Sequence, residues 1–404
     1  MTTKASADSV DLVPPLQSMY IYVTDECDQR CPHCWIRPVR EGHSSLTSPR
    51  LDQYFEFIDA ARPMGLRYVK VTGGEPLLRR ETFAIVEHSA QAGISSTIES
   101  NAMLVGEEQA CFFRDHKVHI GVSLDGASPE VHDRRRGLIG AFERTMRAIR
   151  LMAATGVPLT VTCAVSRSNL GEIEKILELL SRVESRARIV FKINPIVPIG
   201  RARSMKRRGE TLEPHELLHL AETVYEKLLP RFEPQGLKIM LQLEAAFFSV
   251  EGILNGLGKA GTRNCGFLSL ISVLADGSIT FCGIGYAQRH LVMGSIREEY
   301  DLPKLWNAHP LLTEVRRRVR HGLKGICGHC LFHPVCLGGC RASAVAVGGS
   351  LASSPPWCQA LYEAGWFPAT RLDDDAAREY KRIAPRLRAA HGARTGIAEK
   401  ALWP

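Results

Sequence analysis

The chain has 404 residues, of which 45% are hydrophobic and 23% charged, and its formal net charge is +8. This length is sufficient for two or three domains, and so small a basic excess argues against nucleic acid or a membrane surface as a partner. No apolar run is long enough to span a bilayer and residues 1–15 lack a secretory signal, so we expect a cytoplasmic protein whose 12 cysteines serve metal binding or catalysis rather than disulfides.

Short apolar strands alternate with amphipathic helices over residues 19–204. The expected strands cover residues 19–23, 68–72, 96–100, 119–123, 159–165 and 189–193. Helical spacing of apolar residues is clearest at 49–64 and 141–155. Six βα repeats predict an α/β fold whose parallel sheet is open or curved into a partial (β/α)6 barrel of the TIM type, with its chemistry at the carboxyl ends of the strands.

The rest of the chain changes character after the barrel. The predicted parts are an N-terminal segment (1–18), the barrel (19–204), a helical bridge (205–258), a small cysteine-rich domain (259–362) and a helical tail (363–404). Helices are expected at 214–228 and 242–254 in the bridge. In the cysteine-rich part, Asp276-Gly277 predicts a β-hairpin and one helix is expected near 310–319. That part has few core residues and is expected to depend on bound metal for its stability.

Three cysteines, Cys27, Cys31 and Cys34, lie on one loop directly after the first strand. Three thiolates suit an iron–sulfur cluster or zinc. A cubane cluster held by three cysteines leaves one iron open for another ligand. The alternative is a zinc site completed by His33 or by a distant residue.

The spacing Cys27-x3-Cys31-x2-Cys34 resembles the motif of radical S-adenosylmethionine (AdoMet) enzymes. The resemblance implies a [4Fe–4S] cluster whose open iron binds the amino and carboxylate groups of AdoMet. Reductive cleavage would then give a 5′-deoxyadenosyl radical that abstracts a substrate hydrogen. His33 stands at the position that lies near the adenine in the family.

Further motifs stand where this family has them. Gly73-Gly74-Glu75-Pro76 matches its GGEP element, in which the glycines would let the backbone approach the ligand and Glu75 would accept from the cofactor ammonium group. Ser100-Asn101-Ala102 replaces the common TNG, and Asn101 would contact the ribose. The candidate AdoMet contacts are His33, Gly73, Gly74, Glu75, Asn101 and, for the carboxylate, Ser123 and Arg136.

A second group of cysteines exceeds the four ligands of one zinc site. It comprises Cys265, Cys282, Cys327, Cys330, Cys336, Cys340 and Cys358. Its spacing resembles the SPASM domain, which carries two auxiliary [4Fe–4S] clusters and would bring the total to three. The resemblance implies that Cys327, Cys330, Cys336 and Cys358 hold the outer cluster and that Cys265, Cys282 and Cys340 hold the inner one. The inner cluster is then one ligand short, so another side chain binds it or one iron is open.

Auxiliary clusters fit an oxidation, because they can accept the electron that a substrate radical must lose, while the proton needs a base. Asp125 and Glu99 are candidates by position, although each could instead serve the cofactor or its loop. Cys163 could return a hydrogen atom if it points into the barrel; packing is the alternative. Sulfatase-maturing members have an aspartate where this chain has Gly283, which argues against formylglycine formation.

The resemblance favours an oxidoreductase that oxidises or cross-links a ribosomally made peptide. The alternatives are a dehydrogenase or epimerase of a small metabolite, such as an aminoglycoside or a modified haem precursor, and a non-catalytic electron carrier. A flavodoxin- or ferredoxin-type donor is implied. Only 26 residues precede Cys27, so we expect either a separate leader-recognition protein or direct recognition of the peptide by the core. The arginine runs 134–136 and 316–320 could meet an acidic peptide or simply be solvated.

Overall fold

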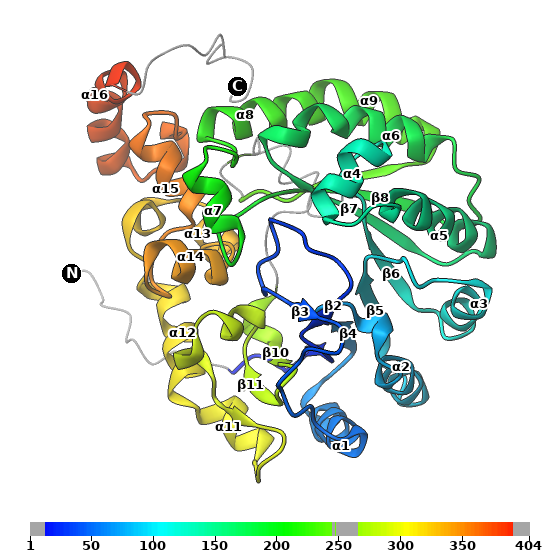
Figure 1. The fold of residues 1–404 in the computed structure, drawn as a ribbon. Helices are drawn as coiled ribbons and strands as arrows, with labels where there is room; N and C mark the ends of the chain where they lie inside the picture. Colours follow the sequence, from blue (N-terminus) through cyan, green and yellow to red (C-terminus); the bar gives the residue numbers. More distant parts are fainter. Residues whose placement is uncertain (1–12, 245–246, 248–265, 391–404) are drawn as a thin grey trace.

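The computed structural model describes residues 13–244, 247 and 266–390 (Figure 1). Within these residues, one ten-stranded sheet has the order β12-β11-β10-β1-β4-β5-β6-β7-β8-β9. Neighbours from β10 to β9 are parallel, whereas β11 and β12 join antiparallel at one edge. The sheet curves and helices cover its outer side, which confirms the predicted partial barrel.

The six predicted strands are all present. They are β1 (Ser18–Tyr22), β4 (Tyr68–Thr72), β5 (Ser95–Ser100), β6 (His119–Ser123), β7 (Leu159–Val165) and β8 (Ile189–Pro195). The helices over residues 13–244 are α1 (Leu51–Ala61), α2 (Glu81–Gln91), α3 (Glu107–Asp115), α4 (Pro129–Arg136), α5 (Ala141–Thr155), α6 (Ile173–Ser181), α7 (Ala202–Arg207), α8 (Pro214–Thr223) and α9 (Leu229–Phe232). Helix α5 has the predicted bounds, because its apolar residues recur at helical spacing and Gly156, with a φ of 83°, ends it in a left-handed turn.

The two faces of the barrel sheet differ in chemistry. On β7, Val161, Cys163 and Val165 are fully buried, whereas Thr160 and Thr162 between them are half-buried. The buried residues belong to the main core with residues of α5 and α6. The strand register aligns the half-buried positions across the sheet, so one face packs on helices and the other forms a polar inner face.

The bridge contains a strand that the sequence did not predict. Strand β9 (Lys238–Leu241) pairs in parallel with β8, so the prediction of an entirely helical bridge is wrong there. Four residues are too few for periodicity to separate a strand from a helix. The predicted helix at 214–228 is confirmed as α8 with a continuing π-helical turn. Residues 242–244 are not helical, and most of the helix predicted at 242–254 lies outside the described residues.

The cysteine-rich segment is joined to the barrel through the sheet. Strand β10 (Leu270–Val273) pairs in parallel with β1, and β11 (Ser278–Thr280) returns antiparallel after Asp276-Gly277, which confirms the hairpin. β12 (Gly294–Ser295) completes the edge. Buried residues of this hairpin, including Val273 and Ile279, belong to the main core. The hairpin of this segment therefore shares the core of the barrel, a source of stability that the sequence did not predict.

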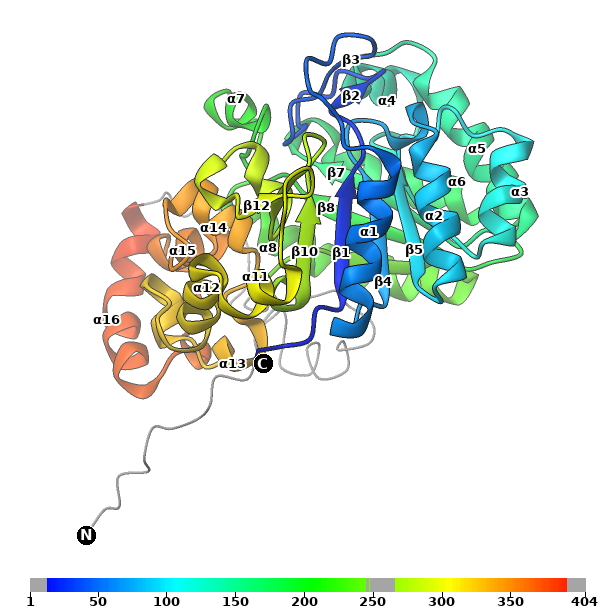
Figure 2. The same cartoon turned by 90° about the horizontal axis from the view of Figure 1, so that it is seen from below.

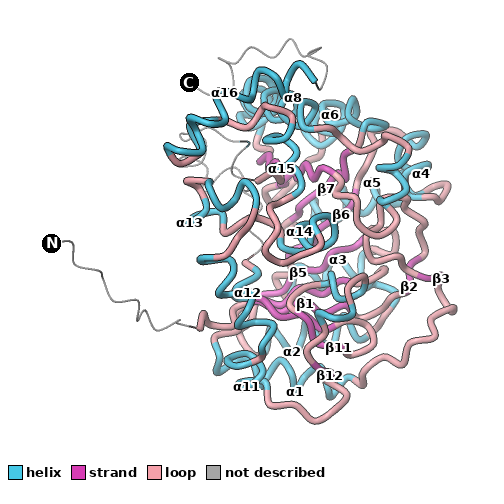
Figure 3. The backbone as a smooth tube through the Cα atoms, turned by 90° about the vertical axis from the view of Figure 1, so that its left-hand side faces the viewer, coloured by secondary structure: helices cyan, strands magenta, loops and turns pink. Residues whose placement is uncertain are grey.

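Helices gather beside this edge of the sheet. Their bounds are α11 (Leu302–Ala308), α12 (Pro310–His321), α13 (His333–Cys336), α14 (Arg341–Gly348), α15 (Pro356–Glu363) and α16 (Asp374–Ala390). Figure 2 shows them on one side of the barrel, and Figure 3 looks onto that side. Helix α12 was predicted, and α16 confirms a helix in the tail. No helix in the described part of the chain is long and apolar enough to cross a membrane.

Candidate functional site

The first cysteine group lies on a loop that closes on itself after β1. Cys27 ends β2 (Glu26–Cys27), which pairs with β3 (Val39–Arg40) on the far side of the loop. The backbone N–H of Cys34 donates to the carbonyl of Cys31 at 3.3 Å. Burial raises the pKa of the Cys27 and Cys34 thiols. Bound iron would deprotonate them, because a coordinated thiol gives up its proton.

No three Cys, His or carboxylate side chains of the described residues converge around one point as they would around a single ion. A cubane cluster does not need such convergence, since each thiolate binds a different iron. Cys27, Cys31 and Cys34 therefore provide a donor set of the right chemistry for a [4Fe–4S] cluster, with sulfur as the preferred ligand.

The Gly73-Gly74-Glu75-Pro76 turn holds this cysteine loop. The N–H of Gly74 donates to the Thr24 carbonyl at 2.8 Å, and the N–H of Glu75 donates to the Glu26 carbonyl at 2.7 Å. A Cβ on Gly74 would fall far inside contact distance of the Glu26 carbonyl oxygen, and one on Gly73 would collide with Thr24. The Cβ positions of both glycines face the loop backbone, so the pair lets the turn approach the cysteine loop closely, a role that the sequence did not predict.

Glu75 is a buried hub between that turn and the end of β5. One carboxylate oxygen accepts from the N–H of Leu77 at 3.0 Å and from the Ser100 hydroxyl at 2.7 Å, and the other accepts from the N–H of Asn101 at 2.8 Å. Burial raises the pKa of Glu75 to about 7. The side-chain amide of Asn101 in turn donates to Asp28, inside the cysteine loop, at 2.6 Å. Glu75 and Asn101 thus lie together at the loop, as their assignment to AdoMet requires.

Asp125 is the centre of a second buried network. Its Oδ2 lies 2.9 Å from Arg136 Nη2 and 3.4 Å from His33 Nε2, and its Oδ1 accepts from the N–H of Ala164 at 2.8 Å. Burial would raise the pKa of Asp125, but the positive charges of Arg136 and Arg135 lower it well below its usual range. Burial also lowers the pKa of His33 to about 3, so its imidazole is neutral.

The same network reaches the cluster ligands. Arg136 Nη1 lies 3.6 Å from Cys31 Sγ, and the Arg136 carbonyl accepts from the N–H of Arg30 at 2.8 Å. Ser123 is half-buried at the end of β6, two residues before Asp125. The structure brings together His33 and Arg136, which the sequence predicted separately, around Asp125. It also places Asp125 in a fixed ion pair, where a lowered pKa makes it a weak base.

Glu99 and Cys163 lie on opposite faces of the sheet. Glu99 is on the inner face, 3.3 Å from the ammonium group of Lys70, which lowers its pKa. Cys163 is fully buried on the outer face, and its sulfur accepts from the Asn169 amide at 3.5 Å. The prediction that Cys163 points into the barrel as a hydrogen donor is wrong, because alternation along β7 turns it toward the helices.

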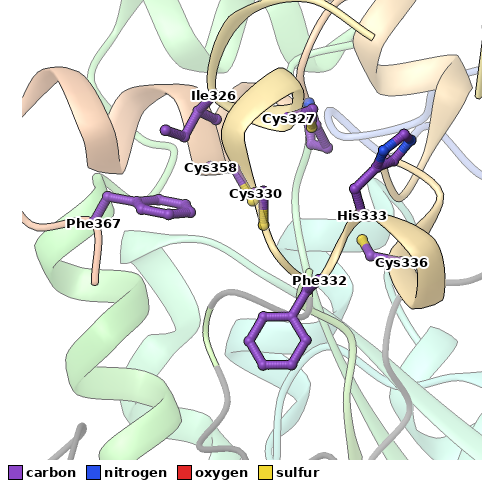
Figure 4. A pocket seen from close by; sticks show the side chains of 10 residues that line it. Ile326, Cys327, Cys330, Phe332, His333, Cys336, Cys358 and Phe367 are labelled. Atoms are coloured by element: carbon purple, nitrogen blue, oxygen red, sulfur yellow. The ribbon is translucent and has the colours of Figure 1, made fainter. Parts of the chain in front are cut away.

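Four cysteines of the second group line one pocket (Figure 4). They are Cys327, Cys330, Cys336 and Cys358, the set predicted for the outer cluster. Burial raises the pKa of Cys327, Cys330 and Cys358, so here too the thiols need a metal to lose their protons. Four thiols on a largely apolar pocket, with Ile326 and Phe367 beside them, fit a second iron–sulfur cluster.

The inner set is described only in part, because Cys265 lies outside the described residues. Cys340 caps the N-terminus of α14, where its sulfur accepts from the N–H of Ser343 at 3.4 Å. Cys282 precedes Gly283, and a Cβ on Gly283 would collide with the hydroxyl of Tyr22. The ring of Tyr22 also packs edge-on against that of Trp35, with 6.3 Å between the ring centroids. The buried phenol of Tyr22 therefore lies between the loop of Cys34 and the inner set of cysteines.

Sequence reasoning missed three buried polar residues here. Tyr22 was treated only as part of a strand. Glu244 is 1% exposed and lies 3.0 Å from the Cβ position of Gly339, next to Cys340. Arg341, also 1% exposed, donates to the carbonyls of Leu351 and Ser353 at 2.9 and 2.8 Å and holds that loop against α14. A charged residue beside a cysteine, as in Cys340-Arg341, is the signal that could have indicated Arg341.

Residues 21–180 match the Radical SAM superfamily. The chain is 31% identical to AdoMet-dependent heme synthase of Methanosarcina barkeri (strain Fusaro / DSM 804), over 85% of this chain and 95% of that protein. It is 25% identical to mycofactocin maturase MftC of Mycobacterium ulcerans (strain Agy99), over 92% and 93%. The solved structure of anSMEcpe with bound AdoMet and a Kp18Cys peptide matches with a TM-score of 0.65 at 20% identity, over 93% of this chain and 99% of that one.

The fold, the cysteine loop and these similarities agree. The family uses AdoMet and a [4Fe–4S] cluster, and the loop of Cys27, Cys31 and Cys34 has the donors that such a cluster needs. The chain belongs to the radical SAM superfamily and is a radical SAM enzyme of the type that carries a C-terminal SPASM domain.

Proposed function

We propose that this enzyme is an oxidoreductase that oxidises or cross-links a ribosomally made peptide. One observation carries the oxidative part: four thiols line a single pocket beside the barrel, where an auxiliary cluster could accept the second electron. The peptide is supported by the relatives, one of which is a maturase and another of which binds a peptide.

The chain's own residues divide the work. Cys27, Cys31 and Cys34 would hold the radical cluster, which together with AdoMet supplies a 5′-deoxyadenosyl radical when bound. Gly74 and Glu75 fix the loop, and Asn101 and Arg136 would contact AdoMet. The outer auxiliary cluster would be held by Cys327, Cys330, Cys336 and Cys358, and the inner one by Cys265, Cys282 and Cys340. The chain would therefore hold three iron–sulfur clusters.

Glu99 is the better candidate for the base that takes the substrate proton. Its carboxylate lies on the inner face of the barrel sheet and is 46% exposed, whereas that of Asp125 is fully buried against Arg136. Each carboxylate is held in an ion pair that lowers its pKa, but of the two only Glu99 is exposed toward the barrel interior. We place the reaction in the cytoplasm, where thiols stay reduced, with a flavodoxin- or ferredoxin-type donor and a separate leader-recognition protein.

A second candidate is the oxidation of a modified haem precursor. It is supported by the similarity of this chain to AdoMet-dependent heme synthase, which is 31% identical and is matched over 95% of its length.

A product assay separates the two. The reconstituted, reduced enzyme is incubated with AdoMet and either a short precursor peptide encoded beside its gene or a carboxylated tetrapyrrole, and the products are weighed by mass spectrometry. We expect the peptide to lose two hydrogens. Glu99→Gln should lower this yield about 100-fold, while Glu143→Gln, exposed on the outer face of α5, should not. Conversion of the tetrapyrrole alone would contradict the peptide proposal.

A further inference from the structure

A basic groove is lined by residues of α7 and α14. Helix α7 belongs to the barrel and α14 to the cysteine-rich helices, and the two lie next to each other in Figure 1. Its volume is about 380 Å³, and its lining is half basic and half apolar. The lining residues are Pro198, Arg203, Lys206, Arg207, Ala346 and Val347. Val347 is 38% exposed, so the groove offers an apolar contact beside three cations.

The charge of this groove is not neutralised within the described part of the chain. Arg203, Lys206 and Arg207 are exposed and form no ion pair with any described residue, whereas the nearby Arg208 pairs with Glu210. Three like charges on one short helix repel each other, which favours an anionic ligand.

Helix α7 is firmly seated although its outer side is charged. Ala202 and Met205 are fully buried and pack with Ile196, against Ala164 at the carboxyl end of β7. The cations therefore project from a fixed surface over the end of the barrel that carries the site. A fixed charged surface loses less entropy on binding than flexible side chains on a loop.

The same helix is tied to the radical-cluster loop. The N–H of Arg201 donates to the Cys34 carbonyl at 2.9 Å, and its guanidinium donates to the Pro38 carbonyl at 2.8 Å. A Cβ on Gly200 would collide with the backbone of Trp35. The groove thus begins next to the loop that would hold the radical cluster.

The two arginine runs predicted as contacts for an acidic peptide do not offer this surface. Arg135 and Arg136 are buried around Asp125. In the second run, Arg316 is buried, and Arg317 and Arg318 both pair with Glu314. These five arginines are therefore buried or already paired, whereas Arg203, Lys206 and Arg207 on α7 are exposed and unpaired among the described residues.

We propose that the α7–α14 groove binds an acidic segment of the substrate peptide and so places the neighbouring peptide residue at the barrel opening. Carboxylates would pair with Arg203, Lys206 and Arg207, and an apolar side chain would lie on Val347. This inference rests on the proposed peptide-modifying function and adds the class of sequence that the enzyme recognises.

The test measures binding to the reconstituted full-length enzyme by fluorescence anisotropy. The probe is a fluorescein-labelled peptide of alternating Glu and Leu, compared with one of alternating Lys and Leu. We expect wild type to prefer the Glu peptide, and the triple variant Arg203→Glu/Lys206→Glu/Arg207→Glu to bind it at least about tenfold more weakly. Binding to wild type should weaken with added salt.

The matched control is Arg144→Glu/Arg147→Glu/Arg150→Glu. These three arginines are also exposed, lie on the outer face of α5 and give the same change in net charge. The control should bind like wild type, and both variants should retain AdoMet cleavage without substrate. Equal loss in both variants, or none in the α7 variant, would overturn the inference. So would a tetracarboxylate porphyrin that binds through these cations while the Glu peptide does not bind. If wild type and the α7 variant oxidise the peptide equally, as measured by mass spectrometry, the inference about the groove is overturned but the proposed function stands.

Discussion

Gly74→Ala is expected to abolish AdoMet cleavage and to lower the free energy of unfolding by at least about 3 kcal/mol. The added methyl group would collide with the carbonyl oxygen of Glu26, which is backbone and cannot rotate away. Relief requires the Gly73–Glu75 turn and the cysteine loop to separate, which breaks the hydrogen bond from the Glu75 N–H to that same carbonyl. Cys27 follows Glu26 directly, so the cluster ligand moves with it.

The control for this variant is Gly171→Ala. Gly171 has no heavy atom within 4 Å of its Cβ position, and its φ is not in the left-handed region. An alanine there should be neutral or slightly stabilising. Urea unfolding, iron content and 5′-deoxyadenosine yield are measured for both variants. If Gly74→Ala keeps its iron and its cleavage activity, the turn does not position the cysteine loop.

Asp125→Asn is expected to lower the free energy of unfolding by about 3–5 kcal/mol, because it leaves Arg136 as an uncompensated buried charge. Arg136 is 5% exposed and Arg135 is 3% exposed, so water cannot replace the lost carboxylate. Arg136 also contacts Cys31, so the variant should lose part of its radical-cluster iron. Asp115→Asn is the control, since Asp115 pairs with Arg114 at the surface and should change stability by less than about 1 kcal/mol.

The loss of free energy of unfolding caused by Asp125→Asn depends on pH, and the sign of this dependence is defined. The pKa of Asp125 is lower in the folded chain than the value of about 3.9 in the unfolded chain. The contribution of ionised Asp125 to the free energy of unfolding is therefore complete above about pH 4. It is lost as the pH falls through the pKa that Asp125 has in the folded chain. The difference between wild type and Asp125→Asn should be equal at pH 5 and pH 7. A difference that disappears at pH 5 would contradict the ion pair.

The sequence predicted the elements whose signal is local. Strands β4, β6 and β7 have the predicted bounds because their apolar residues are flanked by turn residues on both sides. Strand β9 was missed since it has only four residues. The hairpin that contains β10 was predicted, but its pairing with β1, across more than half of the chain, was not. No local pattern reports such a pairing.

In the candidate site, too, the local features could be predicted from the sequence and the long-range contacts could not. The cysteine spacings are local, and four of them meet at one pocket as expected. The contacts that fix the first loop are not local: Asn101 reaches Asp28, and Tyr22 fills the space beside Gly283 only because the hairpin returns to β1. Strand register decides from which face of the sheet the Cys163 side chain projects, and the neighbouring residues in the sequence do not reveal that register.

The division of the cysteines among clusters is the central claim, and iron counting with AdoMet cleavage tests it most directly. The chain is reconstituted anaerobically and reduced, and iron and 5′-deoxyadenosine are measured. We predict about twelve iron atoms per chain with cleavage, and about eight without cleavage in Cys27→Ala/Cys31→Ala/Cys34→Ala. Cys327→Ala/Cys330→Ala should lose about four iron atoms and still cleave AdoMet. Only about four iron atoms in wild type, unchanged when Cys327 and Cys330 are replaced, would contradict the auxiliary clusters.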